Sequence, residues 1–334
     1  MHPKHWLALK KEGLYCIPGD FYIDPVYPVS NALITHGHSD HARSGHKKVL
    51  AQRATIGIMK LRYGENAASE YQSLNYHERI KIKEVVCYLL PAGHILGSAQ
   101  LVMEFDNSRV IVSGDYKRAL DPTCEPFIVE HCDVFVTEAT FALPVFKHPP
   151  IQIEIAKLLT SVNTFPERCH LVGVYALGKC QRLIKNLRLM GYDGPLFIHG
   201  ALKKLCGFYQ SEGIDLGDVQ MASDLNLQDS AGKIVLCPPS ALHDRWSRRF
   251  TKVVVSMASG WMQIRARAKQ KGVELPLIIS DHADWFELTA TIKEINPKEV
   301  WFTHGREEAL IHYLNQLGYK AQALHLLGYE DQED

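Results

Sequence analysis

Five short apolar runs in this sequence each stop at a histidine or an acidic residue. Runs of this kind, rich in β-branched side chains, are typical of strands buried on both faces of a layered α/β core. Polar groups that follow such strands commonly gather in one crevice, because the loops there can converge without interrupting the core. The runs are ALITHGH, ending at His36; RVIVSGD, at Asp115; DVFVTEA, at Glu138; PLIISDH, at Asp281 and His282; and EVWFTHG, at His304. This feature predicts a functional site built from strand ends.

The middle of the chain has a different pattern of apolar residues. Between residues 150 and 277, strand-like runs such as CHLVGVYA alternate with helical segments such as GKCQRLIKNLRLMG. This alternation predicts a separate unit with a parallel sheet. Candidate ligands lie on both sides of it, and the run PLIISDH is expected to return the chain to the first unit. We therefore expect one domain formed by residues 1–143 and 278–334, interrupted by an inserted α/β domain at 144–277.

Composition excludes several classes of protein. The chain has 37 Lys and Arg against 37 Asp and Glu, so a nucleic acid would be held by local basic clusters rather than by overall charge. No apolar run approaches the roughly 20 residues of a membrane span, and the N-terminus lacks the apolar core of a secretory signal. The eight cysteines are scattered without a CxxC pair. This indicates reduced thiols, a cytoplasmic location and a metal, if any, held by histidine and carboxylate.

The stretch ITHGHSDHARSGH, residues 34–46, is the densest group of candidate metal ligands. Alternate side chains of an extended segment point the same way, so His36 and His38 can face one metal ion. Asp40 and His41 follow the strand end and can reach a second position nearby. Two metal ions roughly 3.5–4 Å apart can clamp the attacking and leaving oxygens of a phosphoryl displacement. The spacing therefore indicates a metal site rather than a histidine-rich surface loop.

The remaining ligands of such a centre must come from elsewhere in the chain. Three candidates stand next to glycine at strand or loop ends: His94, Asp115 and His304. Isolated histidines are more often surface or core residues than ligands. His46, just beyond the HGHSDH group, is accordingly expected to face solvent.

These motifs resemble those of a known superfamily. THGHSDHA resembles the HxHxDH signature of the metallo-β-lactamase superfamily, PAGHILGSA and SGDYK resemble its third and fourth motifs, and Asp24 in FYIDP resembles its first. Glu138 in VTEATF, His282 in SDHADW and His304 in THGRE resemble motifs A, B and C of the β-CASP nucleases. The resemblance covers nearly the whole chain. It implies an α/β fold, the metallo-β-lactamase αββα sandwich, with an inserted β-CASP domain.

The resemblance also implies two divalent metal ions, Zn²⁺ first and Mn²⁺ as the alternative. The implied ligands are His36, His38 and His94 for the first ion, Asp40, His41 and His304 for the second, and Asp115 as the bridge. Asp24 would fix the orientation and tautomer of a ligating histidine. Asp40 and Asp115 would thereby take part in catalysis, in which a hydroxide held by both metals attacks the phosphorus.

Two further residues complete the implied machinery. His282 would protonate or stabilise the leaving 3′-oxygen, since imidazole titrates near neutral pH. Glu138 would orient His282 and raise its basicity. A structural role for Glu138, as a cap at the strand end, is the alternative.

The stretch GLYCIPGDFYIDPVYPVSNALITHGHSDHAR is similar to the opening of the bacterial ligase-associated DNA exonucleases. This implies a metal-dependent DNA exonuclease in repair, with a DNA ligase or helicase of the same system as partner. The chief rival is a β-CASP ribonuclease of RNA processing, because histidine at motif C, here His304, matches the RNA-acting pattern. We favour DNA. A catalytically inactive scaffold protein is disfavoured because every expected metal ligand is present. A small-molecule hydrolase is disfavoured because it would have no use for the inserted domain.

Basic clusters in the inserted segment are candidates for gripping the polymer. In GKCQRLIKNLR the cations recur every three residues and are expected to share an exposed helix face opposite Leu183, Ile184 and Leu187. DRWSRRFTK mixes cations with Trp246 and Phe250, which suits phosphates and base stacking. The candidate contacts are Lys179, Arg182, Lys185 and Arg188; Arg245, Arg248, Arg249 and Lys252; and Arg265, Arg267, Lys269 and Lys271. The turn SMASGW resembles one that β-CASP domains present to a terminal phosphate, which makes Ser259 a further candidate.

Overall fold

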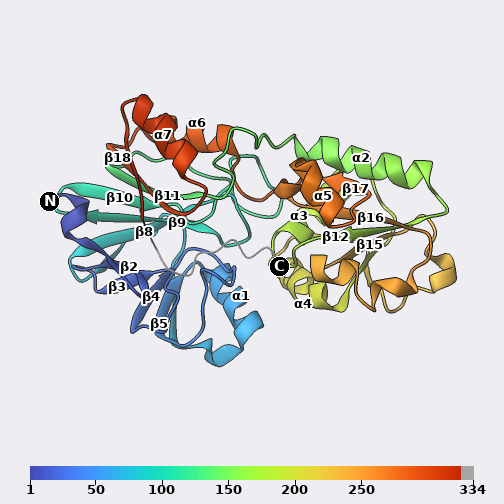
Figure 1. Ribbon diagram of the computed structural model, residues 1–334. Helices are drawn as coiled ribbons and strands as arrows, with labels where there is room; N and C mark the ends of the chain where they lie inside the picture. The colour runs from blue at the N-terminus through green and yellow to red at the C-terminus, as the bar shows by residue number, and fades with distance from the viewer. Residues whose placement is uncertain (325–334) are drawn as a thin grey trace. The chain divides into compact units, whose positions relative to one another are not determined.

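The structure, a computed structural model, describes residues 1–324. Within this range, only the backbone of His304 is described. The chain divides into two units (Figure 1). Of the described residues, unit 1 comprises Met1–Lys147 and those from His282 to Leu324, and unit 2 comprises His148–Asp281. The domain boundaries expected from the sequence each lie four residues before these positions. Among the described residues, no helix combines the length and the apolar character that crossing a membrane requires.

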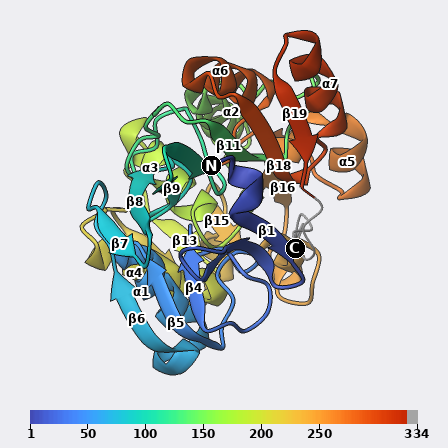
Figure 2. The same ribbon diagram turned by 90° about the vertical axis from the view of Figure 1, so that its left-hand side faces the viewer.

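Unit 1 contains two sheets, one with six strands and one with seven. The first has the order β1-β2-β3-β4-β5-β6, with β1 Leu7–Lys10, β2 Gly13–Cys16, β3 Phe21–Ile23, β4 Asn31–Ile34, β5 His46–Ala51 and β6 Ala68–Ser73. The second has the order β19-β18-β11-β10-β9-β8-β7, with β7 Ile80–Ile82, β8 Val85–Pro91, β9 Ala99–Phe105, β10 Ser108–Val112, β11 Val134–Ala139, β18 Glu299–Gly305 and β19 Lys320–Ala323. Figure 2 looks onto this unit, with the first sheet in blue and β7, β8 and β9 of the second in lighter blue and teal.

The two sheets pack face to face because alternate side chains of each strand point to opposite faces. Leu33 of β4 and Trp301 of β18 belong to the central core, whereas Ile34 and Phe302 belong to the outer ones. Helix α1 (Arg53–Tyr63) covers the first sheet, and helices α6 (Trp285–Ile295) and α7 (Glu308–Gln316) cover the second. Unit 1 is therefore an αββα sandwich, which confirms the expected fold class.

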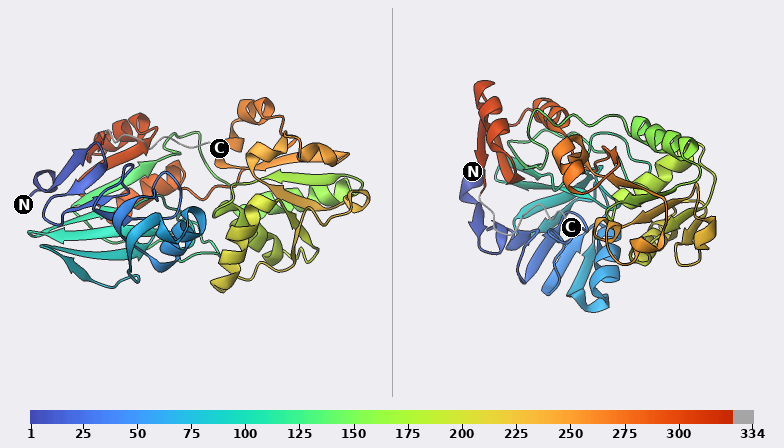
Figure 3. Two further views of the ribbon diagram at one scale, coloured as in Figure 1. Left: turned by 90° about the horizontal axis from the view of Figure 1, so that it is seen from below. Right: turned by 45° about the vertical axis from the view of Figure 1, so that its right-hand side comes forward.

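Unit 2 is built on one six-stranded sheet in which every neighbouring pair is parallel. Its order is β14-β13-β15-β12-β16-β17, with β12 Cys169–Gly173, β13 Leu196–Ile198, β14 Val219–Met221, β15 Ile234–Cys237, β16 Val253–Ala258 and β17 Leu275–Leu277. Its helices are α2 Ile151–Thr164, α3 Lys179–Leu189, α4 Gly200–Ser211 and α5 Arg265–Gln270. Figure 3 shows helices on both sides of this sheet, the arrangement expected of an alternating βα sequence.

One expected strand behaves differently. The run PLIISDH was predicted to return to the first unit as a strand, but β17 ends at Leu277 and pairs with β16 inside unit 2. Residues 278–281 then continue without strand structure to the unit boundary. Apolar character alone could not reveal which sheet accepts a run that lies at a junction between two units.

Candidate metal centre

The candidate site lies where strands of both sheets of unit 1 end. His36 follows β4 by two residues, His94 follows β8 by three, and Asp115 follows β10 by three. Glu138 is the penultimate residue of β11. Positions after buried strands are thus brought together by the sandwich itself. Between β10 and Asp115, Gly114 adopts φ +54°, and a Cβ there would stand 2.7 Å from Thr35 Oγ1, so glycine is required for the two strand ends to approach.

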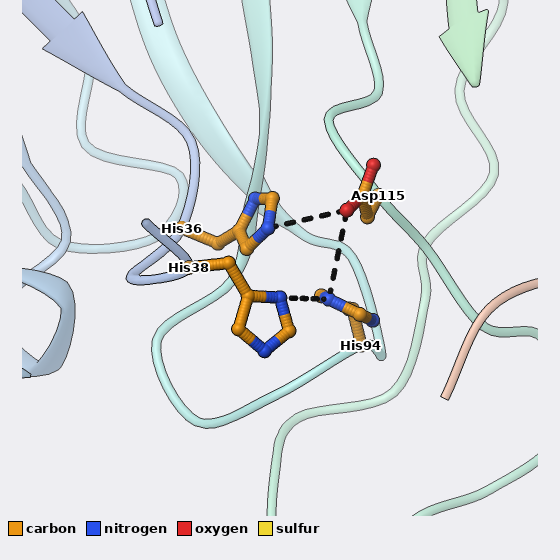
Figure 4. Close-up of side chains that lie close together, drawn as sticks. All are labelled: His36, His38, His94 and Asp115. Atoms are coloured by element: carbon orange, nitrogen blue, oxygen red, sulfur yellow. Dashed lines mark hydrogen bonds and ion pairs between the residues drawn. The ribbon is translucent and has the colours of Figure 1, made fainter. Parts of the chain in front are cut away.

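Four of the expected metal ligands converge in one cluster (Figure 4). The ligand atoms of His36, His38, His94 and Asp115 all lie within 4.8 Å of one another. Asp115 Oδ2 is 3.3 Å from His36 Nε2 and 3.8 Å from His94 Nε2. His94 Nε2 is also 3.0 Å from His38 Nδ1. Three imidazoles and one carboxylate from three separate segments form a donor set of the kind that holds zinc.

The other half of the expected centre adjoins the same carboxylate. His41 Nε2 lies 3.5 Å from Asp115 Oδ2 and 3.7 Å from Asp40 Oδ2. The opposite ring nitrogen, Nδ1, lies 2.8 Å from Asp24 Oδ2. Because an ionised carboxylate only accepts, Asp24 keeps a proton on His41 Nδ1. Nε2 is then the nitrogen that a metal ion beside Asp115 and Asp40 could bind once its own proton is lost. Asp24 therefore lies where it can fix the tautomer of His41.

Asp24 is itself held by a residue that the sequence analysis did not single out. The backbone N–H and the hydroxyl of Thr35 donate to its two carboxylate oxygens, at 2.7 and 2.6 Å. Thr35 Oγ1 is also 3.1 Å from His36 Nδ1. Thr35 thus connects Asp24, which contacts His41, to His36 as well. Its position directly before the HxHxDH motif was the only available signal.

The protonation of the cluster follows from burial and charge. Burial lowers the pKa of His36 well below its usual range, and the neighbouring His41 acts in the same direction. Burial also disfavours the charged forms of His41 and Asp40. For His41, the attraction of the Asp115 and Asp40 carboxylates outweighs burial. For Asp40, the attraction of His41 outweighs it. The pKa of His41 is raised to about 10 and that of Asp40 is lowered to about 2. A metal ion must therefore displace a proton from His41.

The donor atoms fit a bound cation. His36 Nε2 is buried and, among the residues that the structure describes, forms no hydrogen bond; it faces Asp115 Oδ2 instead. A buried ring nitrogen directed at a carboxylate is an arrangement that a metal ion between them would stabilise. The cluster can therefore bind metal ions. The His304 side chain, the remaining expected ligand, lies outside what the structure describes, and its backbone is part of β18.

His282 and Glu138 form a pair beside the cluster. His282 Nδ1 is 3.0 Å from Glu138 Oε2, and its ring centroid is 4.7 Å from that of His94. Glu138 is fully buried, and its Oε1 accepts a hydrogen bond of 2.8 Å from Tyr116 N. The carboxylate therefore contacts both the His282 imidazole and the backbone N–H of Tyr116, so the orienting role stays a prediction and the structural cap stays its alternative. His282 Nδ1 is 3.9 Å from Asp115 Oδ2.

Two more residues around His282 were not anticipated. Lys117 Nζ donates to the carbonyl of His282 at 3.0 Å and to Glu287 Oε2 at 2.6 Å. The pattern Asp284-x-x-Glu287 is a capping box at the start of α6, with Asp284 as the N-cap. That pattern was readable from the sequence, whereas the partner lysine, 165 residues away from His282, was not.

Helix α3 corrects the expectation of an exposed basic face. Leu183 is buried as expected, but so are Lys179 and Arg182, with only 6% and 2% of their surfaces exposed. Lys179 Nζ lies 3.1 Å from Asp281 Oδ1, and Arg182 Nη1 donates to the carbonyl of Ser280 at 3.0 Å. These cations are held by unit 2 itself.

The two later cations of α3 are also engaged within the unit. Lys185 Nζ donates to the carbonyl of Asp215 at 2.8 Å. Arg188 donates to four carbonyls, those of Tyr192, Gly194, Leu216 and Asp218. The spacing of three residues between the cations indicated that they share one face of the helix. It did not indicate whether that face contacts water or the carbonyl oxygens of the same unit. Their role in nucleic-acid binding therefore stays a prediction with a competing structural explanation.

The second basic cluster is more open. Arg245 and Arg248 are exposed, and Lys252 adopts a positive φ at the turn that precedes β16. Arg249 is half-buried; its guanidinium lies 5.0 Å from the Trp246 ring centroid, and it donates to the carbonyl of Ala222. Cations beside an aromatic ring are thus present at the surface of unit 2.

The remaining candidates in unit 2 differ in exposure. Arg265 and Lys269 are exposed, whereas Lys271 is half-buried. The Arg267 guanidinium lies 3.9 Å from the Trp261 ring centroid. Ser259 is buried, and its Oγ accepts a hydrogen bond of 3.3 Å from Trp261 N as the cap of a short 3₁₀ helix. Its predicted contact with phosphate would have to compete with this cap.

Comparison with known proteins agrees with the site's geometry. No model of a protein family matches the chain. A probable DNA ligase of Opitutus terrae is 27% identical over 330 residues, which cover 96% of this chain and 31% of that protein. An RNase J-like protein of Methanocaldococcus jannaschii is 24% identical over 211 residues, 55% of this chain and 50% of that protein. The resemblance to the β-CASP group of the metallo-β-lactamase superfamily is confirmed.

One solved structure is similar in fold to this chain. A protein of unknown function from Enterococcus faecalis V583 matches with a TM-score of 0.59 and 13% identity, over 90% of this chain and 80% of that one. This likeness concerns the fold alone. The chain spans only 31% of the Opitutus ligase and 50% of the RNase J-like protein, so the β-CASP resemblance does not transfer their activities as whole proteins.

Proposed function

We propose that this β-CASP chain is a metal-dependent phosphodiesterase that hydrolyses nucleic acid. The observation that carries the proposal is the convergence of His36, His38, His94 and Asp115 from separate strand ends into one set of metal donors. His41 Nε2 lies 3.5 Å from the same Asp115 oxygen, and Asp40 Oδ2 lies 3.7 Å from that nitrogen. A carboxylate shared between two donor sets is what a pair of metal ions requires.

In the proposed centre, His36, His38 and His94 would hold one divalent ion, and Asp40 and His41 would hold the other with His304 as a further ligand. Asp115 would be shared between them, because its Oδ2 lies 3.3 Å from His36 Nε2 and 3.5 Å from His41 Nε2. When bound, such ions supply an activated water and neutralise charge on the phosphoryl group. Zn²⁺ is our first choice, and Mn²⁺ is compatible with the same histidines and carboxylates.

His282 is proposed to give a proton to the leaving oxygen. Its Nδ1 faces Glu138 Oε2 at 3.0 Å, so the carboxylate stabilises the charged imidazolium from which Nε2 can donate. A P–O bond to the water oxygen forms, the P–O bond to the sugar breaks, and the proton of His282 Nε2 passes to the sugar oxygen. The proton that the water loses goes to solvent, from which His282 is protonated again. Glu138 is buried and held by Tyr116 N, which keeps the ring in one orientation.

We further propose that the substrate is DNA, digested from an end in repair, with a DNA ligase or helicase of the same system as partner. The support is that the likeness to the probable DNA ligase covers 96% of the chain at 27% identity. A cleavage and polyadenylation specificity factor subunit of Arabidopsis thaliana covers 91% of the chain at 21% identity, and the RNase J-like protein covers 55% at 24%. These two relatives keep a β-CASP ribonuclease as the second candidate. The exposed Arg245 and Arg248 are proposed contacts to the phosphates. None of the eight cysteines, all within the described residues, forms a disulfide, which supports a cytoplasmic location.

The test compares matched single-stranded DNA and RNA, each labelled at one end, with the purified protein and added Zn²⁺ or Mn²⁺. An Asp115→Asn variant controls for contaminating nucleases, and Asp229→Asn, at an exposed position, controls for the loss of one carboxylate. We expect stepwise shortening of DNA by the wild type and Asp229→Asn only. Cleavage of RNA alone would establish the ribonuclease, because the site would then require the 2′-hydroxyl. Failure to cleave either polymer would contradict the proposal.

A further inference from the structure

Lys117 is a buried lysine next to the candidate metal centre. Only 5% of its surface is exposed, and an ammonium group removed from water is costly unless it is paired and hydrogen-bonded. Its Nζ has two acceptors: the main-chain carbonyl of His282 at 3.0 Å and Glu287 Oε2 at 2.6 Å. Lysines in this state usually have a specific structural or functional task.

The acceptor Glu287 hydrogen-bonds several residues around the loop that carries His282. Its Oε1 accepts from Ala119 N at 2.9 Å, and its Oε2 accepts from Asp284 N at 3.2 Å as well as from Lys117. Asp284 Oδ1 in turn accepts from the backbone N–H groups of Phe286 and Glu287, both at 2.9 Å. The first turn of α6 is thereby fixed to the segment that follows Asp115.

The same segment contacts the His282 loop through its backbone. Ala283 N donates to the carbonyl of Tyr116 at 2.7 Å, and Tyr116 N donates to Glu138. Lys117 N donates to the carbonyl of Ala92, two residues before His94. The consecutive residues Asp115, Tyr116 and Lys117 thus connect the metal cluster, the Glu138 carboxylate and the His282 main chain.

We propose that Lys117 is a positioning residue for His282, a role that rests on the proposed function. Glu138 holds the imidazole ring from one side, and Lys117 holds the main chain of the same residue from the other. With both contacts the ring nitrogen that faces the leaving oxygen has a fixed place relative to Asp115. Without Lys117, the carbonyl of His282 loses its buried donor and Glu287 loses its counterion, so the loop before α6 can shift.

A neighbouring pair supplies a matched control. Arg118 donates to Thr291 Oγ1 at 3.0 Å and to Glu294 Oε2 at 2.8 Å, both on α6. It ties the same segment to the same helix through the same kind of ion pair. Within the part of the chain that the structure describes, the hydrogen bonds and ion pairs of Arg118 do not include His282. A general loosening of α6 would therefore appear in an Arg118 variant, whereas a shift of His282 would not.

The experiment measures kcat, KM and bound metal for wild type, Lys117→Met, Arg118→Met and His282→Ala. Two DNA substrates are compared: one with the natural leaving oxygen and one in which sulfur replaces that oxygen. A thiolate leaves without a proton because its conjugate acid has a pKa near 8–9, so the sulfur substrate reports on proton donation. Release of the thiol is followed with a chromogenic disulfide reagent.

For Lys117→Met we expect a fall in kcat of about 10- to 100-fold on the oxygen substrate, as for other groups that orient a catalytic side chain. KM and metal content should stay within about twofold, because the metal ligands are untouched. On the sulfur substrate the loss should shrink towards wild type, in parallel with that of His282→Ala. Arg118→Met should match wild type on both substrates.

The proposal is overturned if Lys117→Met behaves like Arg118→Met, or if its loss is equal on the two substrates while that of His282→Ala is relieved. Should Lys117→Met fail to fold, Glu287→Gln tests the same contact: its amide oxygen can keep the capping-box bond from Asp284 N, whereas the counterion of Lys117 and the acceptor of Ala119 N are lost. It should show a smaller loss with the same relief by sulfur. If wild type itself cleaves neither substrate, the proposed nuclease function fails, which is a result distinct from failure of the Lys117 role.

Discussion

The strand ends of unit 1 and helix α3 of unit 2 were both identified from rows of functional-looking side chains, and they differ in what those side chains contact. At the strand ends, His36, His94 and Asp115 face one another across a few ångströms. On α3, Lys179 and Arg182 face an acid and a carbonyl of their own unit. One row forms a candidate site and the other forms part of the fold.

The difference has a physical origin. A polar residue that follows a buried strand has no helix or sheet partner, and the packing of two sheets fixes where it must lie. A cation on a helix has a long flexible side chain whose end can reach water, phosphate or a carbonyl equally well. Position therefore constrains a strand-end ligand much more tightly than it constrains a helical lysine or arginine.

The largest expected effect concerns Asp115. Asp115→Asn keeps the side chain's shape but removes the charge shared by the two donor sets, so nuclease activity should fall by about 10³-fold or more. Initial rates at saturating metal test this. A variant that keeps a tenth of the activity would show that the strand ends are not the catalytic site.

The second expected effect concerns Arg182 and tests the opposite half of the comparison. Arg182→Met should lower the free energy of unfolding by about 2–3 kcal/mol, because it leaves the Ser280 carbonyl without its buried charged donor. Arg248→Met, at an exposed position, should change stability by less than about 0.5 kcal/mol. Urea unfolding measures both.

The same two variants separate the helix from the surface cluster in binding. Arg248→Met should weaken the affinity for a single-stranded oligonucleotide and reduce its dependence on salt, because a phosphate contact is lost. Arg182→Met should leave the salt dependence unchanged at temperatures where it is folded. The reverse pattern would mean that α3 grips the polymer after all.

An intermediate effect is expected at Asp24. Asp24→Asn replaces the carboxylate that fixes His41 Nδ1 at 2.8 Å by an amide, and we expect about a 10- to 100-fold loss of metal affinity. Activity should therefore recover as metal concentration is raised, unlike that of Asp115→Asn. A metal titration of activity distinguishes the two. Loss that no metal concentration relieves would place Asp24 in the chemistry itself.

The smallest effect concerns His46, which was expected in solvent and is instead buried, with Val29 N donating to its Nδ1 at 3.3 Å. Burial lowers its pKa to about 4. Because the folded pKa lies below the unfolded one, the unfolded chain binds the proton first, and stability falls as pH drops from about 6.5 towards 4.

Between pH 7 and 5.5 this residue should remove about 1 kcal/mol from the free energy of unfolding. His46→Gln should flatten that part of the pH profile, while His77→Gln, at an exposed position, should leave it as in wild type. Unfolding in urea at several pH values measures the slope. Equal slopes in wild type and His46→Gln would show that His46 is not the group responsible.

Much of the fold could be predicted because its signals are local. Runs such as RVIVSGD and DVFVTEA became β10 and β11, and the βα alternation became the parallel sheet of unit 2. The run PLIISDH could not be placed, because its pairing with β16 is a tertiary choice between two sheets. The burial of His46 depends in the same way on neighbours distant in sequence.

The candidate site shows the same division. The convergence of His36, His38, His94 and Asp115 followed from motifs and strand ends. Thr35 and Lys117 were missed because their roles depend on hydrogen bonds to Asp24 and to the His282 carbonyl. Such contacts leave no spacing pattern in the sequence. The ligands were predictable, and the residues that hold them in place were not.

The number of metal ions bound per chain tests the central claim most directly. Wild type and Asp115→Asn would be dialysed against Zn²⁺ and, separately, Mn²⁺ at neutral pH, and metal and protein would be measured in each sample. The account predicts two ions per chain for the wild type and one or none for Asp115→Asn. A wild type that holds no metal, or a variant that still holds two, would contradict the dinuclear centre at the strand ends.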